Sequence, residues 1–217
     1  ILGMKSLSFS AQAAGEDEEQ LSDKELALTI LFAFAMAAVL FIAIPTFGAK
    51  FLHSITDDPF YFNLAEGFLR LAIFILYIAA ISRMKDIQRV FQYHGAEHKT
   101  IFCYEADLPL TVENVKKFPR LHPRCGTAFL LIVMIVSIFV FAFLGWPDLW
   151  LRILSRILLL PVVAGISYEI IRFAGRSKNS LVRLATLPGL WLQYLTTREP
   201  DDSQIEVAIK SLEAVQD

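Results

Sequence analysis

Long apolar runs separated by short polar segments dominate the chain. Residues 26–49 carry no charged side chain and are bounded by Glu25 and Lys50. This run is long enough to cross a hydrocarbon core about 30 Å thick. Three further apolar segments follow, at residues 59–82, 126–147 and 149–171. The pattern predicts an all-α, polytopic helical membrane protein with four transmembrane helices.

The remaining segments are predicted to lie outside the hydrocarbon core. Residues 1–25 are acidic and lack the apolar run of a signal peptide. Residues 83–125 are expected to form a helical loop between the second and third spans. Residues 172–197 are too short and too interrupted by proline and glycine to span, so they are predicted as an interfacial or re-entrant helix. Residues 198–217 are expected to form an acidic tail helix.

Lysine and arginine are concentrated on one side of the predicted membrane. The loop between the second and third spans carries eight basic residues, namely Arg83, Lys85, Arg89, Lys99, Lys116, Lys117, Arg120 and Arg124. Because basic loops stay in the cytoplasm, we expect this loop and both termini on the cytoplasmic side of the inner (cytoplasmic) membrane. Its basic side chains are expected to contact anionic lipid headgroups.

Composition supports the membrane class. The chain is 55% hydrophobic and has a mean hydropathy of +0.52, above the usual range of soluble domains. The net charge of −2 says little about partners because the charges are unevenly distributed, and no nucleic-acid partner is expected. The two cysteines are too few for a disulfide framework.

Several ionisable residues fall inside the predicted spans. Such residues are costly in lipid and are usually paired or functional. Glu66 and Arg70 are four residues apart on one helix, and Arg156 is expected at the same depth in the fourth span, where Arg152 also lies. We predict a structural cluster of ion pairs between Glu66, Arg70 and Arg156. A substrate or proton path remains the alternative.

The pattern H-x-x-E-H stands at residues 94–98, within "VFQYHGAEHKTIFCYE". On a helix, His94 and His98 share one face, so both imidazoles can bind one divalent metal. Glu97 could then take a proton from a water at the metal, as in zinc hydrolases whose motif reads in this inverted order. We therefore predict a metal site, with zinc as the expected ion and Glu97 as the catalytic base.

Further metal ligands are expected on the same side of the membrane. The segment "LHPRCGTAF" supplies His122 and Cys125 at a spacing that can chelate one metal, and Glu169 is predicted to emerge there. Cys103 has an apolar flank and is expected in the core, whereas His53 is expected on the outer side. Two alternatives stay open: a closed structural zinc site, and an interfacial cluster that hydrogen-bonds without metal.

The stretch "FQYHGAEHKTIFCYEADLPLTVENVKKFPRLHPRCGTAFL", together with "LLLPVVAGISYEIIRFAG" and "LTTREPDD", resembles the YqhQ-like family of bacterial integral membrane proteins of unknown function. The resemblance covers nearly all of the chain and implies the membrane fold. Because members are described as predicted metal-dependent enzymes, it also implies metal chemistry. Members carry a further amino-terminal region, so we expect that this region is missing before Ile1.

Three functional hypotheses follow from these features. The first is a cytoplasm-facing, zinc-dependent hydrolase acting on a membrane protein segment or a lipid headgroup. The second is a non-enzymatic scaffold or assembly factor, in which a metal or hydrogen-bonded cluster holds the loop for docking to another membrane protein or a second copy. The third is a transporter built on the intramembrane charges, which four spans without an inverted repeat make a weaker hypothesis.

Overall fold

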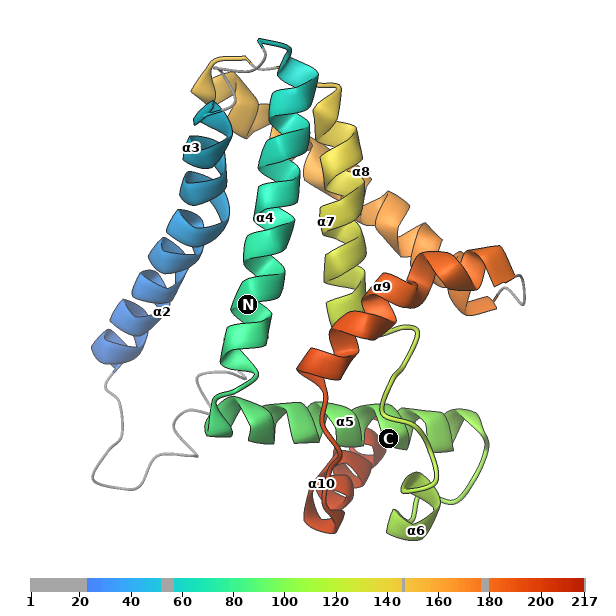
Figure 1. Cartoon of the computed structure of the whole chain (residues 1–217). Coiled ribbons are helices and arrows are strands. Elements are labelled where there is room, and N and C mark those ends of the chain that lie inside the picture. The colour runs from blue at the N-terminus through green and yellow to red at the C-terminus, as the bar shows by residue number, and fades with distance from the viewer. Residues whose placement is uncertain (1–22, 52–56, 146, 177–179, 217) are drawn as a thin grey trace.

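The computed structural model describes residues 23–51, 57–145, 147–176 and 180–216, and all regular structure in these ranges is helical (Figure 1). The predicted all-α class is therefore confirmed for these parts of the chain. His53 and nearly all of the acidic segment at 1–25 lie outside them.

The first hairpin is made by α2, η1, α3 and α4. Helix α2 (Asp23–Ala38), the π-helical turn η1 (Val39–Ala43) and α3 (Ile44–Lys50) follow one another without a break. Helix α4 (Pro59–Ile81) returns beside them (Figure 1). Its start is well defined because the Asp58 side chain accepts a hydrogen bond from the Phe60 amide and a proline occupies the first turn.

The second half of the chain adds three further helices to this hairpin. Helix α7 (Gly126–Ala142) packs against α4, α8 (Leu149–Arg176) and α9 (Ser180–Thr196). Pro161 and Pro188 lie inside α8 and α9. Helix α9 is continuous through Pro188, although the proline and glycine were expected to interrupt this segment.

Three helices are long and apolar enough to cross a membrane by length and composition, namely Lys24–Ala49, Pro59–Ile81 and Trp150–Ala174. They indicate a multi-pass membrane protein. Helix α7 is apolar but has 17 residues, about 25 Å of helix. It ends at Ala142 rather than near residue 147, because the chain turns at Gly145, where φ is +71°.

Helix α5 (Lys85–Glu105) runs across the lower ends of α4 and α7, and α10 (Asp202–Glu213) lies beneath it (Figure 1). The short helix α6 (Val112–Val115) completes this layer. A core joins these helices, formed by Ala96, Cys103, Val115, Ile205 and Ile209. Cys103 is 0% exposed and so lies in a core, as expected. A capping box between Asp201 and Gln204 starts α10.

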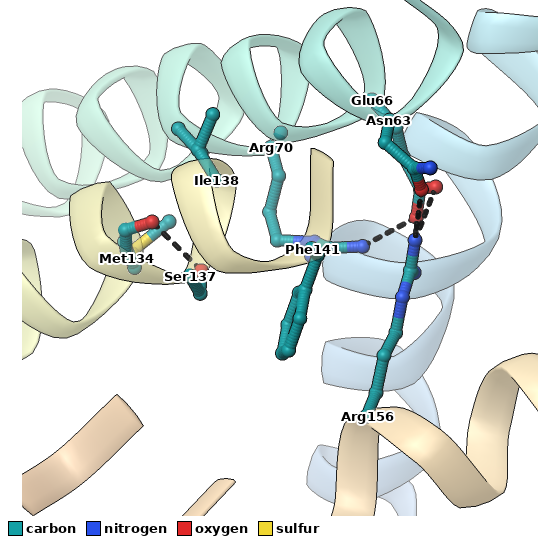
Figure 2. A pocket seen from close by; sticks show the side chains of 9 residues that line it. Asn63, Glu66, Arg70, Met134, Ser137, Ile138, Phe141 and Arg156 are labelled. Carbon is teal, nitrogen blue, oxygen red and sulfur yellow. Dashed lines mark hydrogen bonds and ion pairs between the residues drawn. The ribbon is translucent and has the colours of Figure 1, made fainter. Parts of the chain in front are cut away.

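Three of the charged residues predicted inside the membrane, Glu66, Arg70 and Arg156, meet between α4 and α8 (Figure 2). Glu66 Oε1 lies 2.6 Å from Arg70 Nη2 and 2.7 Å from Arg156 Nη1, and Thr46 on α3 donates a further hydrogen bond to it. The cluster therefore joins α3, α4 and α8. The cavity that it lines measures about 10 Å³, which is room for about one water molecule.

Candidate metal centre

Helix α5 places His94 and His98 one turn apart on the same face, with ring centroids 4.4 Å apart. His94 Nδ1 lies 2.8 Å from the Thr196 carbonyl oxygen, and His98 Nδ1 lies 2.6 Å from that of Arg120. A carbonyl oxygen can only accept a hydrogen bond, so each neutral ring carries its proton on Nδ1. In the neutral rings the Nε2 atoms carry the lone pair that could bind a metal, whereas a ring that donates to the Cys125 thiolate carries a second proton at Nε2, which a metal would replace.

Cys125 faces these two rings from the N-cap of α7. Its Sγ lies 3.3 Å from His94 Nε2 and 3.1 Å from Thr127 Oγ1, and it also hydrogen-bonds with His98. Burial would raise the pKa of this thiol, but these hydrogen bonds lower it to about 4. The position at a helix N-terminus acts in the same direction. Cys125 is therefore a thiolate at neutral pH, the form that binds metals.

The separation of the three groups fits a single metal ion. One ligand atom each from His94, His98 and Cys125 lie within 4.8 Å of one another. In a tetrahedral zinc site, the Zn–N and Zn–S bond lengths place ligand atoms about 3.3–3.6 Å apart. A small inward adjustment of the side chains would close the site on an ion.

The three groups open into a pocket of about 290 Å³. Glu97 also lines this pocket, on the solvent-exposed side of α5. Burial alone would lower the pKa of His94, but the hydrogen bonds with Cys125 and Thr196, together with the charges of Cys125 and Glu97, raise it overall. The charge of Glu97 therefore helps to raise the pKa of His94, although Glu97 is not one of the group of three.

His122 lines the same pocket but does not join the group. Its backbone makes two hydrogen bonds with the Gln193 side chain, at 2.7 and 2.8 Å. Its Nδ1 accepts from the Arg124 amide, and its Nε2 lies 3.7 Å from a carboxylate oxygen of Glu105. Burial, together with the charge of His98, lowers the pKa of this ring.

Glu169 is not brought to the site either. Its side chain is 64% exposed, lies on α8 and pairs with Arg172 at 3.2 Å. It lines neither of the two pockets that Cys125 borders. The structure therefore assembles three of the five predicted metal ligands, His94, His98 and Cys125, and leaves His122 and Glu169 outside the group.

Sequence reasoning missed the groups that orient the ligands. The carbonyl oxygens of Arg120 and Thr196 are backbone atoms, and no side-chain pattern marks them. Thr127, two residues after Cys125, could have been noticed as a hydroxyl near a thiol. Gln193 is fully buried. Its place in an apolar segment was the one feature of the sequence that could have marked it as a buried hydrogen-bonding residue.

Comparison with known proteins confirms the resemblance found in the sequence. A family model described as "Protein of unknown function (DUF1385)" matches residues 1–217. The chain is 42% identical to "Uncharacterized protein YqhQ" of Bacillus subtilis (strain 168) over 228 residues, which cover 96% of this chain and 70% of that protein. No solved structure matches the chain.

Proposed function

The chain belongs to the DUF1385 family of proteins of unknown function, and we propose that it is a membrane-bound, zinc-dependent hydrolase. The observation that carries the proposal is the pair of hydrogen bonds from the His94 and His98 Nδ1 atoms to backbone carbonyls. Metal-binding histidines are typically oriented in this way. Here the orientation turns the Nε2 side of both rings toward the Cys125 thiolate, where a metal would replace the protons that they share with the sulfur.

The number of ligands favours a catalytic over a structural site. Structural zinc sites in proteins have four protein ligands, whereas catalytic sites have three and leave one position open. His94, His98 and Cys125 form a group of three. The pocket of about 290 Å³ beside them provides room for a substrate.

Glu97 is the proposed general base. It borders the pocket beside His94 and His98 and is exposed to solvent, so its carboxylate can exchange protons with water. Zinc, when bound, would supply a Lewis acid that lowers the pKa of water to about 7. Glu97 would take a proton from that water and pass it to the leaving group. His122 would line the substrate pocket, and the cytoplasmic side would be the side from which substrate enters.

Metal content is the decisive first measurement. We expect about one zinc per chain in the detergent-purified full chain by plasma mass spectrometry, lost in His98→Ala and kept in His122→Ala. The second variant is the matched control because His122 lies in the same pocket but outside the group of three. Absence of stoichiometric zinc from a wild-type chain purified without chelators would overturn the proposal.

Glu97→Gln separates a catalytic from a structural metal. We expect the variant to retain zinc and to lose at least about 100-fold in hydrolysis of p-nitrophenyl acetate, because a general base contributes about 10²–10⁴-fold. The control is Glu113→Gln, which alters an exposed carboxylate on α6 away from the pocket. Unchanged hydrolysis in Glu97→Gln would remove Glu97 as base.

A non-enzymatic scaffold is the second candidate, and one observation favours it. Val207 and Val215 on the α10 side are exposed and line an apolar pocket of about 450 Å³ that Glu97 also borders. Such a surface is suited to docking another membrane protein, with the metal holding α5 against α7. Retained zinc without hydrolytic activity in the wild-type chain would favour this candidate.

A further inference from the structure

A second pocket adjoins the metal centre on the side of α8. It measures about 490 Å³ and lies between the start of α7 and the C-terminal part of α8. Cys125 borders it, so the pocket shares one wall with the candidate metal centre. The other lining residues are Arg124, Gly126, Phe129, Tyr168, Ile171 and Arg172.

The lining of this pocket is positively charged. It contains two arginines and neither aspartate nor glutamate among its described lining residues, of which the Cys125 thiolate is the one anionic group. Arg124 pairs with Glu105 and Arg172 with Glu169, but all four side chains are at least 36% exposed. Ion pairs this exposed contribute little to stability, because water screens the charges. The two guanidinium groups can therefore turn to a ligand that offers several anionic oxygens at once.

The backbone adds to this positive potential. Gly126 is the first residue of the 17-residue helix α7 and lies in the pocket wall. The amides of a helix's first turn have no intrahelical acceptor, and the helix dipole is positive at this end; of these amides, that of Thr127 already donates to Cys125. Two arginines and a helix N-terminus thus converge on one cavity, a combination that suits a phosphate group.

The remaining walls are apolar and lie at the end of a candidate span. Phe129 and Ile171 form the apolar walls, and the candidate span Trp150–Ala174 ends two residues after Arg172. The pocket therefore lies at the depth of lipid headgroups if α8 crosses the bilayer. Figure 1 shows α8 slanting away from α7 toward this end.

We propose that this pocket binds an anionic phospholipid, with its phosphate between Arg124, Arg172 and the start of α7 and an acyl chain along Phe129 and Ile171. The lipid phosphate then lies next to Cys125. Anionic phospholipids are then the substrate class of the hydrolase. This assignment rests on the proposed function, whereas the binding of the lipid does not.

Native mass spectrometry of the detergent-purified full chain tests the binding. After delipidation, the wild-type chain is titrated with phosphatidylglycerol, with phosphatidylcholine and with soluble glycerol 3-phosphate. We expect saturable binding of one phosphatidylglycerol, weaker by at least about tenfold in Arg172→Gln, because this variant loses a charge-assisted hydrogen bond to the phosphate. Arg172→Lys is expected to retain most of the affinity.

The matched control is Arg83→Gln. Arg83 is also an exposed arginine just after a candidate span, but it lies outside the pocket. Equal binding by wild type and Arg172→Gln, or equal losses in Arg172→Gln and Arg83→Gln, would overturn the proposal. Glycerol 3-phosphate binding as tightly as phosphatidylglycerol would overturn the lipid assignment. Zinc is quantified in the same samples, so the failure of lipid binding and the failure of the metal site are seen separately.

Discussion

The two cysteines show how strongly local contacts decide the chemistry of one residue. Both are buried, yet Cys125 has hydrogen-bonding imidazoles beside it, whereas Cys103 lies in an apolar core. Burial raises the pKa of Cys103, while the hydrogen bonds from His94, His98 and Thr127 lower that of Cys125 to about 4. Deprotonation of Cys125 therefore stabilises the folded chain, an effect present above the thiol's ordinary pKa and lost as the pH falls through about 4.

Alkylation of the metal-free chain tests this difference. We expect Cys125 to react with iodoacetamide at a rate that is nearly constant from pH 6 to 8, because it is already a thiolate. Cys103 should stay unmodified in the folded chain. In His94→Ala the rate at Cys125 should fall at pH 6 and increase with pH, because one of the hydrogen bonds that stabilise the thiolate is lost while those from His98 and Thr127 remain. Peptide mass spectrometry gives both rates, and a wild-type rate that climbs steeply to pH 8 would contradict the assignment.

For single residues, the sequence predicted which side chains could bind a metal better than it predicted which of them lie together. The four-residue spacing of His94 and His98 was sufficient to place both on one helix face. The H-x-x-C spacing of His122 and Cys125 suggested that they act together, but only Cys125 joins His94 and His98, while His122 Nε2 lies 3.7 Å from a carboxylate oxygen of Glu105. Gln193 holds the His122 backbone from α9, a contact over 71 residues that no local pattern contains.

At the scale of helices, the approach of the chain after α9 to α5 fixes the geometry of the metal centre. The Arg198 amide donates to the Phe91 carbonyl at 2.8 Å, and a Cβ added at Gly95 would overlap the Arg198 carbonyl oxygen. The same stretch of chain carries the Thr196 carbonyl that orients His94. Gly95 therefore allows the close approach on which the orientation of a ligand depends.

Gly95→Ala should disturb both stability and metal binding. Overpacking costs about 1–3 kcal/mol, offset in part by the roughly 1 kcal/mol that alanine gains over glycine within a helix. We expect a lower unfolding temperature and a zinc affinity reduced at least about tenfold by chelator competition. Gly126→Ala is the control, since an added Cβ there meets no atom within 4 Å although it adjoins Cys125. Equal affinities in the two variants would refute this role of Gly95.

The ion-pair cluster of Glu66, Arg70 and Arg156 joins α3, α4 and α8. Removing one partner of a buried pair costs about 3–5 kcal/mol, because the other charge stays buried without compensation. Glu66→Gln should therefore lower the thermal unfolding temperature in detergent strongly. Glu169→Gln, which alters an exposed pair with Arg172, should change stability by less than about 1 kcal/mol and leave the zinc content unchanged. Similar stability in both variants would argue against a structural role for Glu66.

The extents of the helices were predictable where charges or caps bound them, as at Asp58 and Pro59 before α4. They were less predictable within uniformly apolar sequence. Nothing in the composition near Ala142 marks the end of α7, which depends on the turn at Gly145. The crossing of α5 beneath α4 and α7 (Figure 1) depends on tertiary packing, so the sequence predicted a helical loop without its direction.

For the whole molecule, the decisive question is whether α7 crosses the bilayer. Its 25 Å or so of helix is slightly short for a hydrocarbon core of about 30 Å, but bilayers thin locally at modest cost. Helix α7 also packs against α4, which is itself a candidate span. We therefore expect α7 to be the fourth span, which places residue 148 outside the cell and α10 in the cytoplasm.

Two engineered cysteines distinguish this topology from its alternatives. Asp148 and Lys210 are both exposed, so Asp148→Cys and Lys210→Cys present accessible thiols; both are made in a Cys125→Ser background, because Cys125 borders open pockets, whereas Cys103 is fully buried. With a membrane-impermeant maleimide on intact cells, we expect labelling of Asp148→Cys alone, and labelling of Lys210→Cys only after permeabilisation. Because α5 and α10 share one core, they lie on the same side of the membrane, so α7 and α8 either both cross or neither does. If neither crossed, Asp148→Cys would stay unlabelled in intact cells, and that result would reject the four-span topology. Labelling of Lys210→Cys in intact cells would place α5 outside as well and would reject a metal centre facing the cytoplasm.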